Sequence, residues 1–147
     1  GMTSPAKSTT CTIIPALRYR DAKAAIAWLC EAFGFERKAV FENGNGGIAH
    51  AELVLGNGKI MLGSERDNAF GKFNVHPRDT GGRSTQSAYV VVRDPDAHYA
   101  QAKAHGAEIV VELSSEPHGR GYSCRDLEGH LWNFGDYDPW AATDTHG

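Results

Sequence analysis

The chain has 147 residues, a mass of 15.9 kDa, 41% hydrophobic residues and a formal net charge of −3, which fit one compact domain or two small modules that share a core. The slight acidic excess argues against a nucleic-acid partner, and no apolar run approaches the roughly 18 residues that span a bilayer. Because residues 1–5 carry no secretion-signal pattern and the three cysteines form no CxxC pair, we expect a cytoplasmic protein with reduced thiols.

Alternating apolar residues over 12–20 predict a first strand with Ile13, Leu17 and Tyr19 on its apolar face. Asp21 is a candidate N-cap for a helix over 22–33, which Gly34 ends. Residues 35–42, 48–55 and 59–63 are predicted strands, with a hairpin turn at 56–58. Residues 64–83 are polar and rich in glycine, which predicts a structureless linker or a functional loop.

The second half of the chain repeats this order of elements. A strand over 85–93 precedes a helix capped by Asp94, with Pro95 at its first position and Gly106 at its end. Strands follow over 108–113, 122–125 and 130–135. The glycine-rich segment 118–121 between two of these strands is interpreted as a mobile flap.

Three pairs of landmarks indicate that the two halves are copies of one module. Asp21 and Asp94 are 73 positions apart, the helix-ending glycines 34 and 106 are 72 apart, and the hairpin glycines 58 and 129 are 71 apart. Such a long period is typical of a duplicated module rather than a short solenoid repeat. We therefore expect a first strand–helix–three-strand module at 11–64, a linker at 65–83, a second module at 84–137, and tails at 1–10 and 138–147.

A tandem strand–helix–three-strand module of this size resembles the vicinal oxygen chelate superfamily, which includes glyoxalase I, bleomycin resistance proteins and extradiol dioxygenases. The phrases that carry the resemblance to the glyoxalase-like branch are Tyr19-Arg20-Asp21, Ala32-Phe33-Gly34-Phe35, His50-Ala51-Glu52-Leu53, Gly106-Ala107-Glu108 and Asp126-Leu127-Glu128-Gly129-His130-Leu131-Trp132. The resemblance implies an α+β fold in which a curled mixed sheet surrounds a cleft and the helices pack outside. It also implies a homodimer whose clefts are completed across subunits.

Side-chain alternation divides each strand into a helix-facing side and a cleft-facing side. The cleft side of the third strand comprises Ile48, His50, Glu52 and Val54, whereas Cys124 falls on the helix side as an inert core thiol. Polar side chains predicted to line the cleft and bind a ligand are Arg18, His50, Glu52, Ser87, Tyr89, Ser123, Arg125 and Asn133. Arg18 has two interpretations, an ion pair with Glu52 or a fork for a ligand's carboxylate or phosphate. His130 is interpreted as a structural residue that binds loop backbone.

The resemblance implies four metal-ligand positions, which fall on Ile14, Ser87, Asn133 and Leu62 (or Met61 if the register shifts). Ile, Leu and Met cannot bind a hard divalent cation, and Ser and Asn are weak ligands. We therefore expect no metal and no other cofactor, although His50 and Glu52, two residues apart on one strand face, remain a feasible two-ligand arm for a different site.

The leading hypothesis is a metal-independent protein that binds a small organic ligand without turnover, as the drug-sequestering relatives do. Its expected partners are that ligand and a second copy of the chain, with no nucleic acid and no membrane. The alternative is a lyase, isomerase or hydrolase in which His50 or Glu52 acts as general base, with or without an unusual metal. A third hypothesis, a pure interaction module, predicts a plugged cleft.

Overall fold

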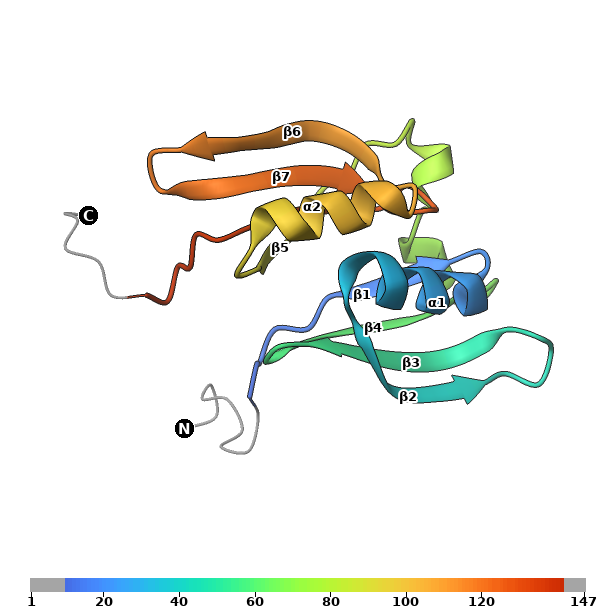
Figure 1. The fold of residues 1–147 in the computed structure, drawn as a ribbon. Helices are drawn as coiled ribbons and strands as arrows, with labels where there is room; N and C mark the ends of the chain where they lie inside the picture. The colour runs from blue at the N-terminus through green and yellow to red at the C-terminus, as the bar shows by residue number, and fades with distance from the viewer. Residues whose placement is uncertain (1–9, 142–147) are drawn as a thin grey trace, which may run out of the picture.

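The computed structural model describes residues 10–141 and contains two four-stranded mixed sheets and two α-helices (Figure 1). The first module comprises β1 (Ala16–Tyr19), α1 (Ala22–Phe33), β2 (Glu36–Glu42), β3 (Ile48–Leu55) and β4 (Gly58–Ser64). The second comprises β5 (Ala88–Val91), α2 (Pro95–Ala104), β6 (Glu108–Glu116), β7 (Gly119–Arg125) and β8 (Leu131–Gly135). The predicted α+β class and tandem modules are thus confirmed. The tails predicted at 1–10 and 138–147 lie mostly outside the described residues.

Both sheets have the same strand order, which confirms the internal repeat. The orders are β1-β4-β3-β2 and β5-β8-β7-β6, and in each sheet the first strand runs parallel to the last strand of its module. Asp21 and Asp94 accept from the amides of Ala24 and Ala97, so both predicted helix N-caps are present. Gly34 adopts φ of 89° beyond α1, as the left-handed end of that helix requires.

The two helices lie between the two sheets and contact each other (Figure 1). Each sheet therefore turns one face toward the helices and the other face away from the second module. In the described part of the chain no helix covers these outer faces. The resemblance implied a cleft with the helices packed outside; within one chain the helices instead lie between the two sheets, and the outer sheet faces are not enclosed.

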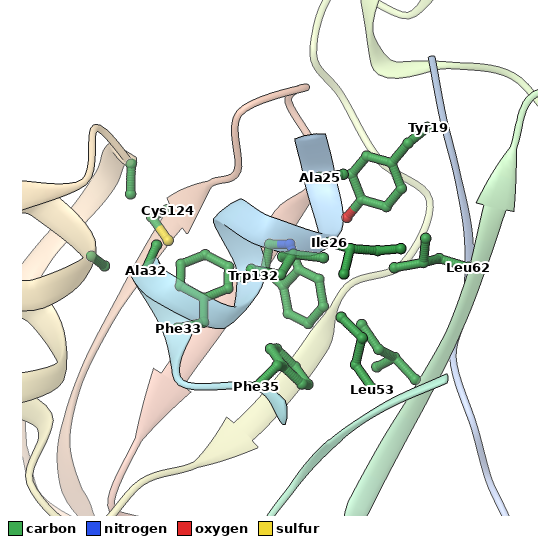
Figure 2. Close-up of a cluster of buried hydrophobic side chains, with 14 of the residues drawn as sticks. Tyr19, Ala25, Ile26, Ala32, Phe33, Phe35, Leu53, Leu62, Cys124 and Trp132 are labelled. Atoms are coloured by element: carbon green, nitrogen blue, oxygen red, sulfur yellow. The ribbon is translucent and has the colours of Figure 1, made fainter. Parts of the chain in front are cut away.

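One hydrophobic core joins the modules (Figure 2). The aromatic ring of Phe33, from the end of α1, packs against Trp132 and Phe134 of β8 with ring centroids 5.5 and 4.7 Å apart. Cys124 is fully buried there, as its parity predicted, and burial raises the pKa of its thiol to about 12. Neither module thus has a separate core.

Several local predictions are corrected. Both first strands are shorter than expected, and Ile13 precedes β1 with 82% of its surface exposed. The linker is not structureless, because it contains short 3₁₀ helices at Gly71–Phe73 and Pro77–Asp79. Residues 119–121, predicted as part of a flap, begin β7 and pair with β6 across a turn at 117–118.

A β-bulge changes the side chains that β3 presents. Phe41 pairs with His50 while the next residue, Glu42, pairs with Ile48, so Ala49 is an extra residue on β3. The bulge turns Ile48 into the core, where it is 1% exposed, contrary to its predicted place on the cleft side. His50 and Glu52 follow the bulge and stay on the outer face, opposite the buried Ala51 and Leu53.

The turn before β8 holds the two modules together through polar contacts. Buried Asp126 accepts from the Tyr19 hydroxyl at 2.6 Å and from Trp132 Nε1 at 3.1 Å. Glu128 accepts from the backbone amides of Arg20 and Asp21 at the start of α1, at 2.7 and 2.9 Å. His130 Nε2 lies 2.8 Å from the carbonyl of Arg18, so His130 has a backbone contact as predicted, but with strand β1 rather than with a loop.

Glu128 makes the stability of this junction depend on pH. Burial opposes its charged form, but the amide bonds from Asp21 and Arg20 and the contact with His76 at 2.8 Å outweigh burial and lower its pKa. A lowered pKa means that the folded chain binds the proton more weakly than the unfolded chain. The stabilisation is therefore complete above a pH of about 4.5 and is lost as the pH falls through the lowered pKa.

We expect Glu128→Gln to destabilise the protein by about 1–2 kcal/mol at pH 7 and by less at a pH of about 3.5. The measurement is urea unfolding at both pH values. Glu31→Gln, on the exposed surface of α1, is the matched control and should change neither value by more than about 0.5 kcal/mol. A loss for Glu128→Gln that is equal at both pH values would contradict the assignment.

Candidate functional site

The outer face of the first sheet carries three of the predicted ligand-binding residues, Arg18, His50 and Glu52. Leu17 and Tyr19 belong to the core, so strand alternation directs Arg18 to the outer face of β1. The register β1–β4 pairs Ala16 with Met61 and Leu17 with Leu62. Leu62 is buried, so Met61 occupies the outer-face position for which the sequence left two alternatives.

Glu52 is engaged with two cationic or potentially cationic neighbours. Its carboxylate oxygens lie 2.9 Å from His50 Nε2 and 2.9 Å from Lys59 Nζ. Hydrogen bonds from His50 and Lys59 lower the pKa of Glu52 below its usual value. A carboxylate with a lowered pKa is a weaker base, so the electrostatics do not favour Glu52 as the general base of the enzyme hypothesis. The alternative that Glu52 pairs with Arg18 is wrong.

The outer face of the second sheet carries Ser87, Tyr89, Ser123 and Asn133. The Asn133 side chain donates to Ser87 Oγ at 2.8 Å and to the Ala88 carbonyl at 3.0 Å, and its Oδ1 accepts from Ser123 Oγ at 2.6 Å. The Tyr89 hydroxyl donates to the carbonyl of Tyr137 at 2.8 Å. Burial and the nearby Asp136 raise the pKa of Tyr89, so this phenol stays neutral at physiological pH.

A shallow cavity of about 200 Å³ lies on this second outer face. Gly135, one of its lining residues, accommodates the Tyr89 side chain, because a Cβ there would lie 2.7 Å from the Tyr89 hydroxyl. Sequence reasoning named three of its lining residues for ligand binding, Tyr89, Ser123 and Asn133, but assigned no such role to the residues from β6 and from the chain after β8. The missed residues include Val111, Ser114 and Tyr137. Its volume lies below the roughly 300–1,000 Å³ typical of small-molecule sites, as expected for a site that one chain only partly encloses.

Arg125 does not join either group. Its guanidinium donates to Glu108 at 2.8 Å and to the Gly82 carbonyl at 3.2 and 3.3 Å. These contacts hold the end of the linker against β6 and β7, which gives Arg125 a structural explanation. The predicted residues therefore fall into two sets on two outer faces, with Arg125 apart from both.

The donor set does not fit the metal of the metal-dependent relatives. On the outer faces, the last-strand positions are the Met61 thioether and the Asn133 amide, and the Asn133 amide already binds Ser87 and Ser123. Among residues 10–141 no three His, Cys, Asp or Glu side chains are grouped so that they can hold a metal ion. The His50–Glu52 pair supplies two ligands at most, and Lys59 competes for the carboxylate.

Comparisons with known proteins identify relatives along most of the chain. The profile described as the Glyoxalase/Bleomycin resistance protein/Dioxygenase superfamily matches residues 12–134. The crystal structure of TioX from Micromonospora sp. ML1 shares 34% identity over 86% of this chain and 98% of its own, with a TM-score of 0.68. The protein Rv0887c of Mycobacterium tuberculosis is 28% identical over 82% of this chain and 71% of its own.

More distant structures share the fold. The fosfomycin resistance protein FosX of Listeria monocytogenes, crystallised in a mutant form with Mn(II) and 1S,2S-dihydroxypropylphosphonic acid, is 14% identical, with a TM-score of 0.61 over 86% of this chain and 89% of its own. In the described part of this chain, no helix is long and apolar enough to cross a membrane.

Proposed function

Because the chain belongs to the Glyoxalase/Bleomycin resistance protein/Dioxygenase superfamily, we propose that it binds a small organic molecule without the help of a metal ion. The observation that carries this proposal is the pair of outer sheet faces, on which partly buried polar groups lie beside exposed apolar side chains. Tyr89, Val91 and Val111 are exposed on one face and Phe41 on the other. Apolar walls with a few oriented polar groups are typical of small-molecule sites.

The proposal includes a homodimer in which an outer face of one chain closes over an outer face of another. A single chain leaves these faces uncovered, and the cavity on the second outer face is smaller than a typical ligand site. Edge strands β1 and β5 each pair with one strand only, so both present free backbone groups to a second copy. The expected location is the cytoplasm, and neither nucleic acid nor membrane is an expected partner.

The enzyme hypothesis receives less support. Of its two candidate bases, Glu52 has a lowered pKa and is held by Lys59 and His50. His50 in turn is directed at Glu52 and stacks on Phe41 with ring centroids 6.3 Å apart. Both contacts explain the two residues as parts of a polar surface. The interaction-module hypothesis predicts a face plugged by side chains, which the cavity beside Tyr89 does not favour.

Native mass spectrometry of untreated protein tests the three parts of the proposal together: the dimer, the absence of a metal ion and the binding of a small molecule. We expect a dimer mass, with no Mn, Fe, Ni or Zn at a stoichiometric level after growth in medium that contains all four. Added aromatic acids and amides of fragment size should appear as bound adducts and be released with unchanged mass.

Each element of the proposal has its own contrary result. One bound divalent ion per chain would refute metal independence, and a monomer at about 10 μM, well above typical obligate-dimer dissociation constants, would refute the dimer. Conversion of a bound compound would favour the enzyme hypothesis over binding alone.

A further inference from the structure

The outer face of the first sheet contains an arginine without a counter-ion. Arg78, Arg120 and Arg125 each have a carboxylate oxygen within 3.1 Å. Among residues 10–141, by contrast, no carboxylate lies within 4.0 Å of the Arg18 guanidinium and no side-chain hydrogen bond from it is formed. The other described arginines without such a carboxylate are exposed, whereas Arg18 is half-buried. A partly desolvated cation is stabilised by an anion beside it, which makes Arg18 a candidate for binding one.

The backbone around Arg18 is shaped to hold its guanidinium. Gly63 pairs with Arg18 across β1 and β4, and a Cβ at Gly63 would lie 2.7 Å from Arg18 Nη1. Any side chain at this position would therefore displace the guanidinium. The bulge at Ala49 brings the Ala49 carbonyl to the same place, 2.9 Å from the same Cβ position.

A second arginine reaches this place from the linker. Arg66 Nη2 donates to the carbonyl of Ala49. The two guanidinium groups thus approach one side of Gly63 from different segments. Burial and the charge of Arg66 lower the pKa of Arg18, in line with the approach of the two guanidinium groups. Two adjacent like charges repel each other unless an anion lies between them.

The second module lacks this charge. Seventy-three positions after Arg18, the repeat places Val91, which pairs with Gly135 as Arg18 pairs with Gly63. The fold therefore needs a small residue on the last strand but does not need an arginine on the first. A positive charge confined to one copy of a duplicated module is better explained by a ligand than by the architecture.

We propose that Arg18 and Arg66 bind the oxyanion of a small organic ligand, a carboxylate or a phosphate, on the outer face of the first sheet. Guanidinium groups suit these anions because their planar forks donate two parallel hydrogen bonds. The inference rests on the proposed function, since it names the charged group of the ligand. Exposed Phe41 on the same face supplies an aromatic surface for the rest of that ligand.

The test follows backbone amide signals in ¹H–¹⁵N spectra of the dimer while potassium benzoate, benzamide or inorganic phosphate is added. We expect benzoate to shift the signals of Gly63 and Ala49, and uncharged benzamide to leave them unchanged. A phosphate shift at the same amides extends the site to phosphates, whereas its absence restricts it to carboxylates. Arg18→Gln should weaken benzoate binding about tenfold or more, and Arg18→Lys, which keeps the charge but loses the fork, by less.

Arg37→Gln is the matched control, because Arg37 lies exposed on β2 of the same sheet. It should leave the benzoate affinity within about twofold of the parent protein, as expected for a distant, screened charge. Equal weakening by Arg18→Gln and Arg37→Gln, or equal shifts with benzamide, would overturn the oxyanion site. Shifts confined to Tyr89 and Asn133 would overturn it too, while leaving the proposed binding function supported.

Discussion

Asp126→Ala is expected to lower the free energy of unfolding by about 3–5 kcal/mol, a large part of the stability of a domain of this size. The buried carboxylate accepts from Tyr19, Trp132 and the backbone amides of Glu128 and His130. Alanine leaves these donors without an acceptor, and Tyr19 and Trp132 are themselves 0% and 1% exposed. The measurement is urea unfolding followed by tryptophan fluorescence, because Trp132 is one of the donors.

Two further variants separate the hydrogen bonds from other effects. Asp126→Asn keeps the shape of the side chain and one acceptor oxygen, so it should lower the free energy of unfolding by less than Asp126→Ala does. Asp67→Ala, at an exposed site in the linker, should stay within about 0.5 kcal/mol of the parent protein. If Asp126→Ala proved no more damaging than Asp67→Ala, the polar junction would not hold the modules together.

Phe33→Ala is expected to lower the free energy of unfolding by about 3–5 kcal/mol, through the loss of packing between the modules. The ring is 1% exposed and contacts Trp28, Trp132 and Phe134. Its removal leaves a cavity at the centre of the shared core (Figure 2). Differential scanning calorimetry should show one transition at a lower temperature, because both modules depend on this ring.

Phe73→Ala provides the control for that variant. Phe73 lies in the linker with 83% of its surface exposed, so its truncation should change stability by less than about 0.5 kcal/mol. Two separate unfolding transitions in Phe33→Ala would show instead that each module has a core of its own.

The repeat was predictable because it is encoded in local signals that recur. Asp21 and Gly34 bound the first helix in the structure as they do in the sequence, since a cap and a left-handed glycine act within one turn. The bounds of the strand over 48–55 were predicted to the residue, because glycines at 47 and 56 flank its apolar residues, although the bulge at Ala49 interrupts its alternation. These features depend on residues that are close together in the chain, so they can be predicted from the sequence alone.

The arrangement of the modules was not predictable from alternation alone. Alternation identifies which side chains share a face of a strand, but it does not show whether that face meets the other module or a second chain. Arg125 illustrates the limit, since it has the parity of Ser123 but binds the Gly82 carbonyl of a linker whose path the sequence does not reveal. The prediction for Ile48 was wrong for another reason. The extra residue Ala49 on β3 turns the Ile48 side chain to the opposite face of the sheet.

The polar junction was missed for the same reason as the path of the linker. Its motif, residues 126–130, was recognisable as a turn, and a structural role was predicted for His130. The contact of Glu128 with the start of α1 joins residues 108 positions apart, and His76 reaches it from the linker. Contacts at such separations carry no local pattern, so only the folded chain shows them.

The distance along the chain between Glu128 and the helix that it binds has a consequence for biosynthesis. When residues 16–64 have left the ribosome, the amides of Arg20 and Asp21 still lack their acceptor, and Phe33 lacks the β8 aromatic rings that will cover it. The first half then exposes an apolar helix until the last strand is synthesised, and loop closure over such separations slows folding. Chaperones that shield nascent apolar segments should therefore engage the first half and release it only after residue 135 emerges.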